Sequence, residues 1–294
     1  MDERLYTLSV DDLSLLRDEN KQQALSALEF GKVVYFPSYS FTVATNEQHL
    51  LSESILDGTH KNISYDYTRQ RVSGLEADSG HSLEEQVQQF MHRFSEFSKQ
   101  LLDTLLPQYT EDLQWGRTSY RPAEIKGRKS SKRKDDTRLH VDSFPATPVN
   151  GLRILRVFCN INPYGEPRVW HIGEPFTQVL AKFAPHIPPF SATRAKLLQL
   201  VKATKSLRSP YDHYMLNLHD NMKLDDSYQQ SLSKQQVDFP PNSTWLVFTD
   251  QVSHAALSGQ YLLEQTFYLP VTAMKNPALS PLRQWEKEKS QALV

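Results

Sequence analysis

The segment 113–270 consists of short apolar runs separated by Pro, Gly, Asn and Asp, and this spacing limits the folds that it can adopt. Examples are GLRILRVFCNIN at 151–162, TWLVF at 244–248 and QYLLEQTFYLP at 260–270. Runs of about five to eight apolar residues between turn-forming residues are typical of β-strands. We therefore expect an antiparallel barrel or sandwich here, interrupted by one helix at about 192–203 after the helix breaker HIPP.

The first 112 residues have a helical pattern instead. The clearest helix is predicted from Ser82, which has the capping-box spacing to Glu85, to Pro107. Its apolar positions recur at helical spacing: Val87, Phe90, Met91, Phe94, Phe97, Leu101, Leu102 and Leu105. Such a stripe indicates a helix that packs against a sheet and braces the barrel.

Weaker signals precede that helix. Asp11 or Asp12 can cap a helix that ends at Gly31, the β-branched run KVVYFP predicts a strand, and a second helix can begin near Thr45. We expect one domain over 1–294: a mainly helical support with one or two strands at 1–112, a β core at 113–275, and a polar tail at 276–294 that forms a short helix or frays.

The composition is that of an ordinary globular protein, with 39% hydrophobic and 23% charged residues. No apolar run has the length of a membrane span, and the start MDERLYTLSVDD lacks the pattern of an export signal, so we expect a cytoplasmic location. The single cysteine, Cys159, lies within an apolar run and is interpreted as a buried structural thiol.

The charge is distributed unevenly, because residues 117–138 carry a net charge of +6 and the rest of the chain −7. A basic segment on an otherwise acidic chain favours an anionic partner, which could be phosphate, carboxylate, nucleic acid or a membrane surface. A solvated loop without a partner is the commoner fate of such segments.

One histidine pattern carries metal chemistry. Among ten histidines, only His140 is followed two residues later by a carboxylate, Asp142. Residues two apart on an extended chain point to the same face, so both side chains can bind one ion. His254 is the best third ligand, because it follows the predicted strand TWLVF and precedes a Ser258-Gly259 turn. Two histidines and one carboxylate leave three positions open, as needed for iron(II), a bidentate cosubstrate and dioxygen.

The residue pattern alone leaves alternatives to this ligand set open. His171, His213 and His219 also lie among apolar residues and compete for the third position. A zinc hydrolase would use similar ligands, but it usually adds a glutamate within a His-Glu-x-x-His motif, which is absent from the sequence.

Two segments, TRLHVDSFPATPVNGLRILRVFCNINPYGEPRVWHIGEPF and WLVFTDQVSHAALSGQYLLEQTFYLP, resemble the Kdo 3-hydroxylase family, and the resemblance spans most of the chain. Those enzymes of Gram-negative bacteria use iron(II), 2-oxoglutarate and dioxygen to hydroxylate carbon 3 of 3-deoxy-D-manno-octulosonic acid (Kdo) on lipid A, with release of succinate and carbon dioxide. The resemblance implies the ligands His140, Asp142 and His254. We expect an α+β fold whose core is a double-stranded β-helix, or jelly roll, braced by N-terminal helices.

The chain departs from the wider oxygenase superfamily at the cosubstrate site. Many members anchor 2-oxoglutarate with an arginine about ten residues after the last histidine, where this chain has Glu264 and Gln265. Arg153 and Arg156, on the strand after the His-x-Asp pair, are three residues apart and face opposite sides. We expect Arg156 to bind 2-oxoglutarate, with Arg153 second and Gln265 assisting; a structural ion pair is an equal alternative for either arginine.

The basic segment supplies the expected substrate contacts. Kdo carries a carboxylate and lipid A carries phosphates, so we expect contacts from Arg117, Arg121 and Arg128 first, and then from the cluster Lys132, Arg133 and Lys134. The expected partner is the Kdo-lipid A glycolipid, with peripheral contact at the cytoplasmic face of the inner membrane and no nucleic acid. Two alternatives are an oxygenase of the same fold that acts on nucleic acid or another anionic substrate, and a non-catalytic glycan-binding β-helix protein.

Overall fold

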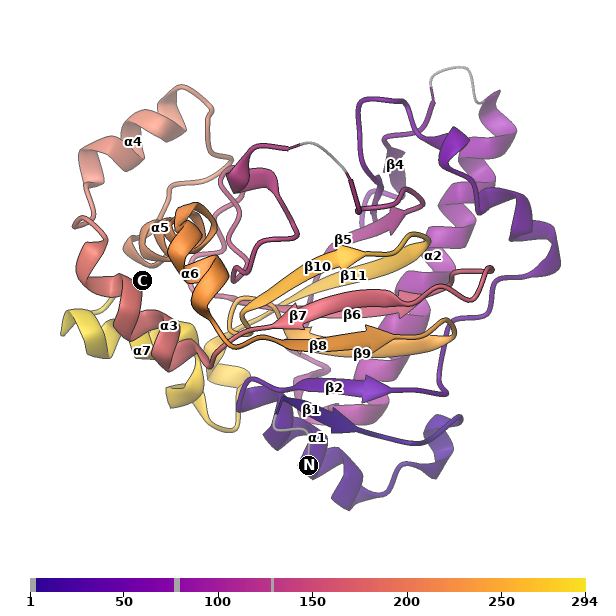
Figure 1. The fold of residues 1–294 in the computed structure, drawn as a ribbon, viewed down its shortest axis with the longest axis horizontal. Helices are drawn as coiled ribbons and strands as arrows, with labels where there is room; N and C mark the ends of the chain where they lie inside the picture. The colour runs from indigo at the N-terminus through magenta and orange to yellow at the C-terminus, as the bar shows by residue number, and fades with distance from the viewer. Residues whose placement is uncertain (1–3, 77–79, 128–129) are drawn as a thin grey trace.

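Two β-sheets form the centre of the molecule (Figure 1), which a computed structural model describes for residues 4–76, 80–127 and 130–294. The large sheet has eight strands in the order β1-β2-β9-β6-β11-β5-β3-β4, and the small sheet has three in the order β10-β7-β8. The strands are β1 (Leu5–Thr7), β2 (Val33–Phe36), β3 (Ile63–Asp66), β4 (Arg71–Ser73), β5 (Gln114–Arg121), β6 (Arg153–Asn160), β7 (Arg168–Ile172), β8 (Gln235–Phe239), β9 (Ser243–Phe248), β10 (His254–Ser258) and β11 (Leu262–Leu269).

An aromatic cluster holds the two sheets face to face. Phe239 of β8 stacks on Trp245 of β9 at 4.0 Å between ring centroids, and Trp170 of β7 meets Phe158 of β6 at 5.0 Å. Aromatic pairs in such geometries stabilise a core beyond the area that they bury. The molecule is therefore an α+β protein with packed sheets, and the predicted strands at 151–162, 244–248 and 260–270 coincide with β6, β9 and β11.

Two helices cover the outer face of the large sheet, α1 (Asp18–Glu29) and α2 (Gly80–Leu105). Strand alternation explains the contact: Leu155 and Val157 of β6 point outward into the core cluster that contains both helices, whereas Phe158 points between the sheets. The predicted apolar stripe of α2 is buried against the large sheet, except for Phe97, which is half-buried.

A second group of helices lies at one end of the sheets (Figure 1): α3 (Phe176–Phe183), α4 (Ala192–Leu200), α5 (Pro210–Leu224), α6 (Asp226–Ser231) and α7 (Pro281–Lys289). The sequence predicted α4 alone within the β segment, so that expectation was incomplete. The helix α3 buries Phe176, Val179, Leu180 and Phe183, a helical spacing that was available in the sequence. Across the described ranges, no helix is both long and apolar enough to cross a bilayer.

Several predicted boundaries in the first 112 residues were wrong. Asp12 caps only a short 3₁₀ turn, accepting from Ser14 N at 2.7 Å, and α1 begins at Asp18. The helix expected near Thr45 is the 3₁₀ helix Thr45–Leu50. Since α2 begins at Gly80, Ser82 lies inside the helix and does not cap it. The described residues of this part of the chain also form four short strands, which extend both edges of the large sheet, in place of the one or two expected.

The C-terminal tail is part of the core and does not fray. Trp285 of α7 is fully buried and stacks on Tyr214 of α5, with 5.1 Å between ring centroids. Leu293 is also fully buried, and its backbone N–H donates to Glu286. The polar composition of residues 276–294 concealed this contact, because the few buried apolar side chains of the tail, among them Leu282, Trp285 and Leu293, are scattered among charged residues.

Candidate metal centre and its cavity

The structure brings His140, Asp142 and His254 together, with their ligand atoms all within 4.8 Å of one another. His254 is the first residue of β10, and its backbone exchanges two hydrogen bonds with His140, at 3.0 and 2.9 Å. The backbone N–H of Asp142 donates to Thr249 O at 2.8 Å. The main chain therefore fixes all three positions before any ion binds.

Each imidazole is oriented by its own backbone. Nδ1 of His140 lies 2.8 Å from Arg138 O, and Nδ1 of His254 lies 2.8 Å from Val252 O. A carbonyl only accepts, so Nδ1 carries the proton in each neutral ring, and Nε2 has the lone pair that a metal requires. Nε2 of His140 is 3.7 Å from Asp142 Oδ1.

The electrostatics favour the ligand form of each side chain. Burial lowers the pKa of His140, and His254 and Lys223 lower it further, so this ring is neutral near pH 7. Burial also lowers the pKa of His254. Burial raises the pKa of Asp142, but Arg156 and the two histidines outweigh it and the net shift is downward. Two neutral imidazoles and one carboxylate are the ligand set expected for a divalent transition metal.

The rival histidines lie elsewhere. His171 is on β7, half-buried, between the inward residues Trp170 and Ile172, and therefore points away from the sheet interface. His213 of α5 contacts Pro188 O at 2.8 Å. His219 is near the cluster, with its ring centroid 5.4 Å from that of His140, but it is not one of the three grouped ligands.

A cavity of about 790 Å³ opens beside this cluster, and its inner wall is cationic. Arg156 of β6 lies 3.2 Å from both Asp142 and Glu264. Arg121 of β5 lies 3.0 Å from Glu264 and 3.7 Å from Asp136. The charges of both arginines are therefore matched by carboxylates within the wall.

Arg168 of β7 differs from its neighbours in this wall. In the described ranges it has no carboxylate within 4 Å; its Nη1 donates to Gly259 O at 2.8 Å, and its buried Nε has no hydrogen-bond partner. Burial, with Arg121 nearby, lowers the pKa of Arg168 to about 9, so it stays charged at neutral pH. Gly259 has φ +111°, and a Cβ there would lie 3.0 Å from Arg168 Cδ, so the turn requires glycine.

Arg153 and Gln265 lie on the other side of the large sheet. Arg153 is fully buried in an ion pair, with its Nε 2.7 Å from Asp250, and it also donates to Gln251. The Gln265 side chain accepts from Thr118 at 2.6 Å. The predictions that Arg153 is the second cosubstrate arginine and that Gln265 assists were therefore wrong in placement, because neither lines the cavity.

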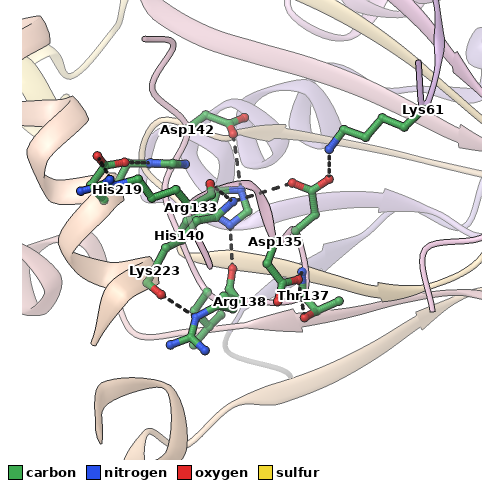
Figure 2. Close-up of polar contacts among 12 residues, drawn as sticks. Lys61, Arg133, Asp135, Thr137, Arg138, His140, Asp142, His219 and Lys223 are labelled. Carbon is green, nitrogen blue, oxygen red and sulfur yellow. Dashed lines mark hydrogen bonds and ion pairs between the residues drawn. The ribbon is translucent and has the colours of Figure 1, made fainter. Parts of the chain in front are cut away.

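Two lysines of the cavity lining, Lys61 and Lys223, lie on different sides of His140 (Figure 2). Lys61 lies 2.6 Å from Asp136, and Lys223 of α5 lies 3.7 Å from the same carboxylate. Burial raises the pKa of Asp136, but Arg121 and Lys61 outweigh this and lower it. His219, one helical turn before Lys223, also lines this cavity. The sequence reasoning missed Lys61, Asp136 and Lys223, since their positions depend on contacts between distant segments.

The predicted substrate residues are divided by the fold. Arg121, Arg133 and Lys134 line the cavity, and Arg117 lines an adjoining cavity of about 510 Å³. Lys132 lines neither cavity and pairs with Asp226 at 2.5 Å; Arg133 pairs with Asp220 at 3.0 Å. Arg128 lies outside the described residues. Much of the +6 charge is therefore neutralised by acidic residues that lie far away in the sequence.

The site has the two-histidine, one-carboxylate arrangement of non-haem metal oxygenases. The chain belongs to the family described as 3-deoxy-D-manno-oct-2-ulosonic acid (Kdo) hydroxylase, whose sequence profile matches residues 13–292.

Solved structures of KdoO, described as a Kdo hydroxylase and non-haem Fe(II) α-ketoglutarate-dependent dioxygenase, are similar over nearly the whole chain. The complex with α-ketoglutarate and Fe(III) has 44% sequence identity and a TM-score of 0.94, and the match covers 99% of this chain and 97% of the other. The complex with cobalt(II) has the same identity and coverage, with a TM-score of 0.95. No curated protein sequence matches the chain.

Proposed function

We propose that this protein is an iron(II)- and 2-oxoglutarate-dependent dioxygenase that hydroxylates carbon 3 of Kdo, giving D-glycero-D-talo-oct-2-ulosonic acid, succinate and carbon dioxide. The observation that carries the proposal is the buried cluster of His140, Asp142 and His254 beside a cationic cavity, in a member of the Kdo hydroxylase family. KdoO, at 44% identity, is described with the same metal and cosubstrate.

We assign the packed sheets to a double-stranded β-helix. Two features support this: β10, β7 and β8 face β11, β6 and β9 across one aromatic core, and the metal cluster lies where the two sheets meet. In such a barrel the inward side chains of both sheets share one interior. The proposed domain is single over 1–294, because strands from the first 112 residues belong to the same sheet as β5, β6, β9 and β11.

His140, Asp142 and His254 are the proposed ligands of iron(II). Bound iron supplies the redox chemistry that couples oxidative decarboxylation of 2-oxoglutarate by dioxygen to insertion of one oxygen atom into a C–H bond. The residues of the chain orient the reactants. Arg156 holds the Asp142 carboxylate in its charged form, and the backbone carbonyls of Arg138 and Val252 hold Nδ1–H of each imidazole.

Arg156 and Arg168 are the proposed binding groups for the distal carboxylate of 2-oxoglutarate. Both are buried in the cavity wall. The sequence predicted Arg156 for this role, and Arg168 was identified only in the structure. Arg168 is the stronger of the two, because Arg156 is already matched by Asp142 and Glu264 whereas the guanidinium of Arg168 has no carboxylate partner in the described chain. A buried guanidinium favours a charge-assisted pair with a bound carboxylate.

The proposed substrate is Kdo attached to lipid A, in peripheral contact with a membrane. Lys61, Lys134 and Lys223 provide cationic groups at the cavity for the Kdo carboxylate and its neighbouring phosphates. Arg117 and Arg121 are the proposed substrate contacts in the adjoining cavity. Arg133 is the proposed substrate contact at the exposed rim of the metal cavity. Lys132 is proposed only as support for the rim, through Asp226.

The test is turnover of purified protein with iron(II), 2-oxoglutarate and dioxygen on Kdo-bearing lipid A. Mass spectrometry of the lipid should report a gain of one oxygen on the Kdo fragment, together with succinate. The Asp142→Ala protein is the control and should give neither product. Succinate release stimulated by a methylated oligonucleotide, without modified lipid, would contradict the proposal and favour a nucleic-acid substrate.

A further inference from the structure

The helix α4 and the segment after it carry an unusual concentration of exposed apolar side chains. In the described ranges, Leu197 is 56% exposed, Leu200 79%, Val201 61% and Leu207 44%. The first three are spaced i, i+3 and i+4 and therefore form one stripe, on the side of α4 away from its buried residue Ala195. Exposed apolar residues normally occur singly on a protein surface, and a group of this kind marks an interaction site.

The same segment is strongly basic. No acidic residue occurs between Glu174 and Asp212, whereas Arg194, Lys196, Lys202, Lys205 and Arg208 all lie in this interval. In the part of the chain that the structure describes, Arg194, Lys196, Lys202 and Lys205 have no carboxylate within 4 Å, in contrast to the paired Lys132 and Arg133. Positive charge without a carboxylate partner is therefore concentrated on α4 and the residues that follow it.

Two hydrogen bonds join this segment to residues that line the cavities. The backbone N–H of Lys205 donates to Ala146 O at 2.8 Å, and Nη2 of Arg208 donates to Pro145 O at 2.7 Å. Pro145 lines both the metal cavity and the adjoining cavity, and Lys205 lines the adjoining one. Figure 1 shows α4 at the periphery of the molecule, away from the sheets.

We propose that residues 194–208 are a bilayer-docking surface: Leu197, Leu200 and Val201 enter the interface of an anionic leaflet, and the flanking lysines and arginines contact its phosphates. Apolar insertion combined with basic residues is how helices lie in a membrane interface. A second copy of the chain fits less well, since this surface offers no acidic group to pair with its own cations. Docking here places Lys205 and its neighbour Pro145, which line the adjoining cavity and the metal cavity, close to the leaflet that carries the glycolipid.

The test is flotation of the full-length protein with vesicles of phosphatidylcholine alone and of phosphatidylcholine mixed equally with phosphatidylglycerol, without any Kdo lipid. The wild type should float with the anionic vesicles, and added salt should weaken the binding. Leu200→Ser with Val201→Ser, and separately Lys196→Gln with Lys202→Gln, should lower the partition coefficient, by about fivefold per lost charge in the second case. The matched controls are Leu15→Ser and Arg17→Gln with Arg71→Gln, which change exposed residues outside the segment and should float like the wild type.

The docking surface rests on the proposed function for the identity of the leaflet, but the two can fail independently in this experiment. Vesicle binding that is lost in the segment variants, while they still turn over a short soluble Kdo glycoside, supports the docking surface. Vesicle binding without any Kdo hydroxylation would overturn the proposed function alone. Failure of the wild type to bind anionic vesicles, equal loss in the controls, or a dimer that Leu200→Ser dissociates would overturn the docking surface.

Discussion

His140, Asp142 and His254 are held by the main chain, so their substitution should remove the metal and spare the fold. We expect His140→Ala, Asp142→Ala and His254→Ala each to weaken Mn(II) or Co(II) binding by more than about 100-fold. Loss of a group that only hydrogen-bonds to a metal ligand typically costs less than this. Metal titration with circular dichroism measures both properties. His171→Ala is the matched control, because His171 is a half-buried histidine that points away from the cavity. Retained affinity in His254→Ala, or its loss in His171→Ala, would contradict the assignment.

Arg168 should affect the cosubstrate without affecting the metal. Arg168→Gln removes a buried charge that has no carboxylate partner in the described chain, and we expect 2-oxoglutarate affinity to fall by about 10- to 100-fold at unchanged Mn(II) affinity. Anaerobic isothermal titration of the Mn(II) protein measures both. Arg156→Gln should lower both affinities, since Arg156 also pairs with Asp142. Arg117→Gln, at a half-exposed arginine, is the control and should leave 2-oxoglutarate affinity unchanged. Unchanged 2-oxoglutarate affinity in Arg168→Gln would contradict the proposed role of Arg168.

Strand alternation predicted from the sequence which of the two arginines of β6 faces the cavity. Arg156 shares the inward face of β6 with Phe158 and lines the cavity, whereas Arg153 faces outward and pairs with Asp250. The partners of Arg156 could not be predicted in the same way. Glu264 is on a neighbouring strand in space but more than a hundred residues away in the chain, and only the register of β6 with β11 brings them together.

At the scale of elements, the segments 151–162, 244–248 and 260–270 were predicted as strands, because each is short, rich in β-branched and aromatic residues, and flanked by turn formers. The helices α3 and α5 were missed, and α5 is the more instructive case. Polar residues interrupt its apolar ones, and two of them, His219 and Lys223, line the cavity, whereas His213 contacts Pro188 O away from it. A helix that provides polar groups to a site has a weakened hydrophobic pattern.

The helix α7 should contribute substantially to stability. Trp285→Ala removes a fully buried side chain that stacks on Tyr214, and we expect a loss of about 3 to 5 kcal/mol in the free energy of unfolding. Urea denaturation monitored by circular dichroism measures it. Lys287→Ala, an exposed change in the same helix, should have little effect. Since Tyr214 is on α5, which also carries Lys223, equal stability of Trp285→Ala and wild type would mean that the tail does not support the cavity wall.

At the scale of the whole molecule, metal binding should stabilise the fold by mass action. The ligands join β10 to the extended segment that contains His140 and Asp142, so an ion binds the native state and not the unfolded chain. A free metal concentration of about 100 times Kd should add roughly 2.7 kcal/mol, or about 5 °C in Tm. Differential scanning calorimetry with Mn(II) measures the shift. The Asp142→Ala protein should show none, and an equal shift in that variant would place the stabilising ion elsewhere.

The distribution of charge is also a property of the whole molecule. Residues 117–138 looked like the cationic surface in the sequence, but Asp220, Asp226 and Glu264 fold back onto that segment and pair with its cations. Local counting cannot find such partners. The interval around α4 keeps more of its charge, because Arg194, Lys196, Lys202 and Lys205 have no carboxylate within 4 Å in the described chain, unlike the paired Lys132.

The reciprocal hydrogen bonds between the backbones of His140 and His254 have a consequence for how this protein acquires its ion. Because folding already places both imidazoles and orients them through carbonyl contacts, loading requires no ordering of the chain. The ion can therefore enter late, into a finished protein, and leave again without loss of structure.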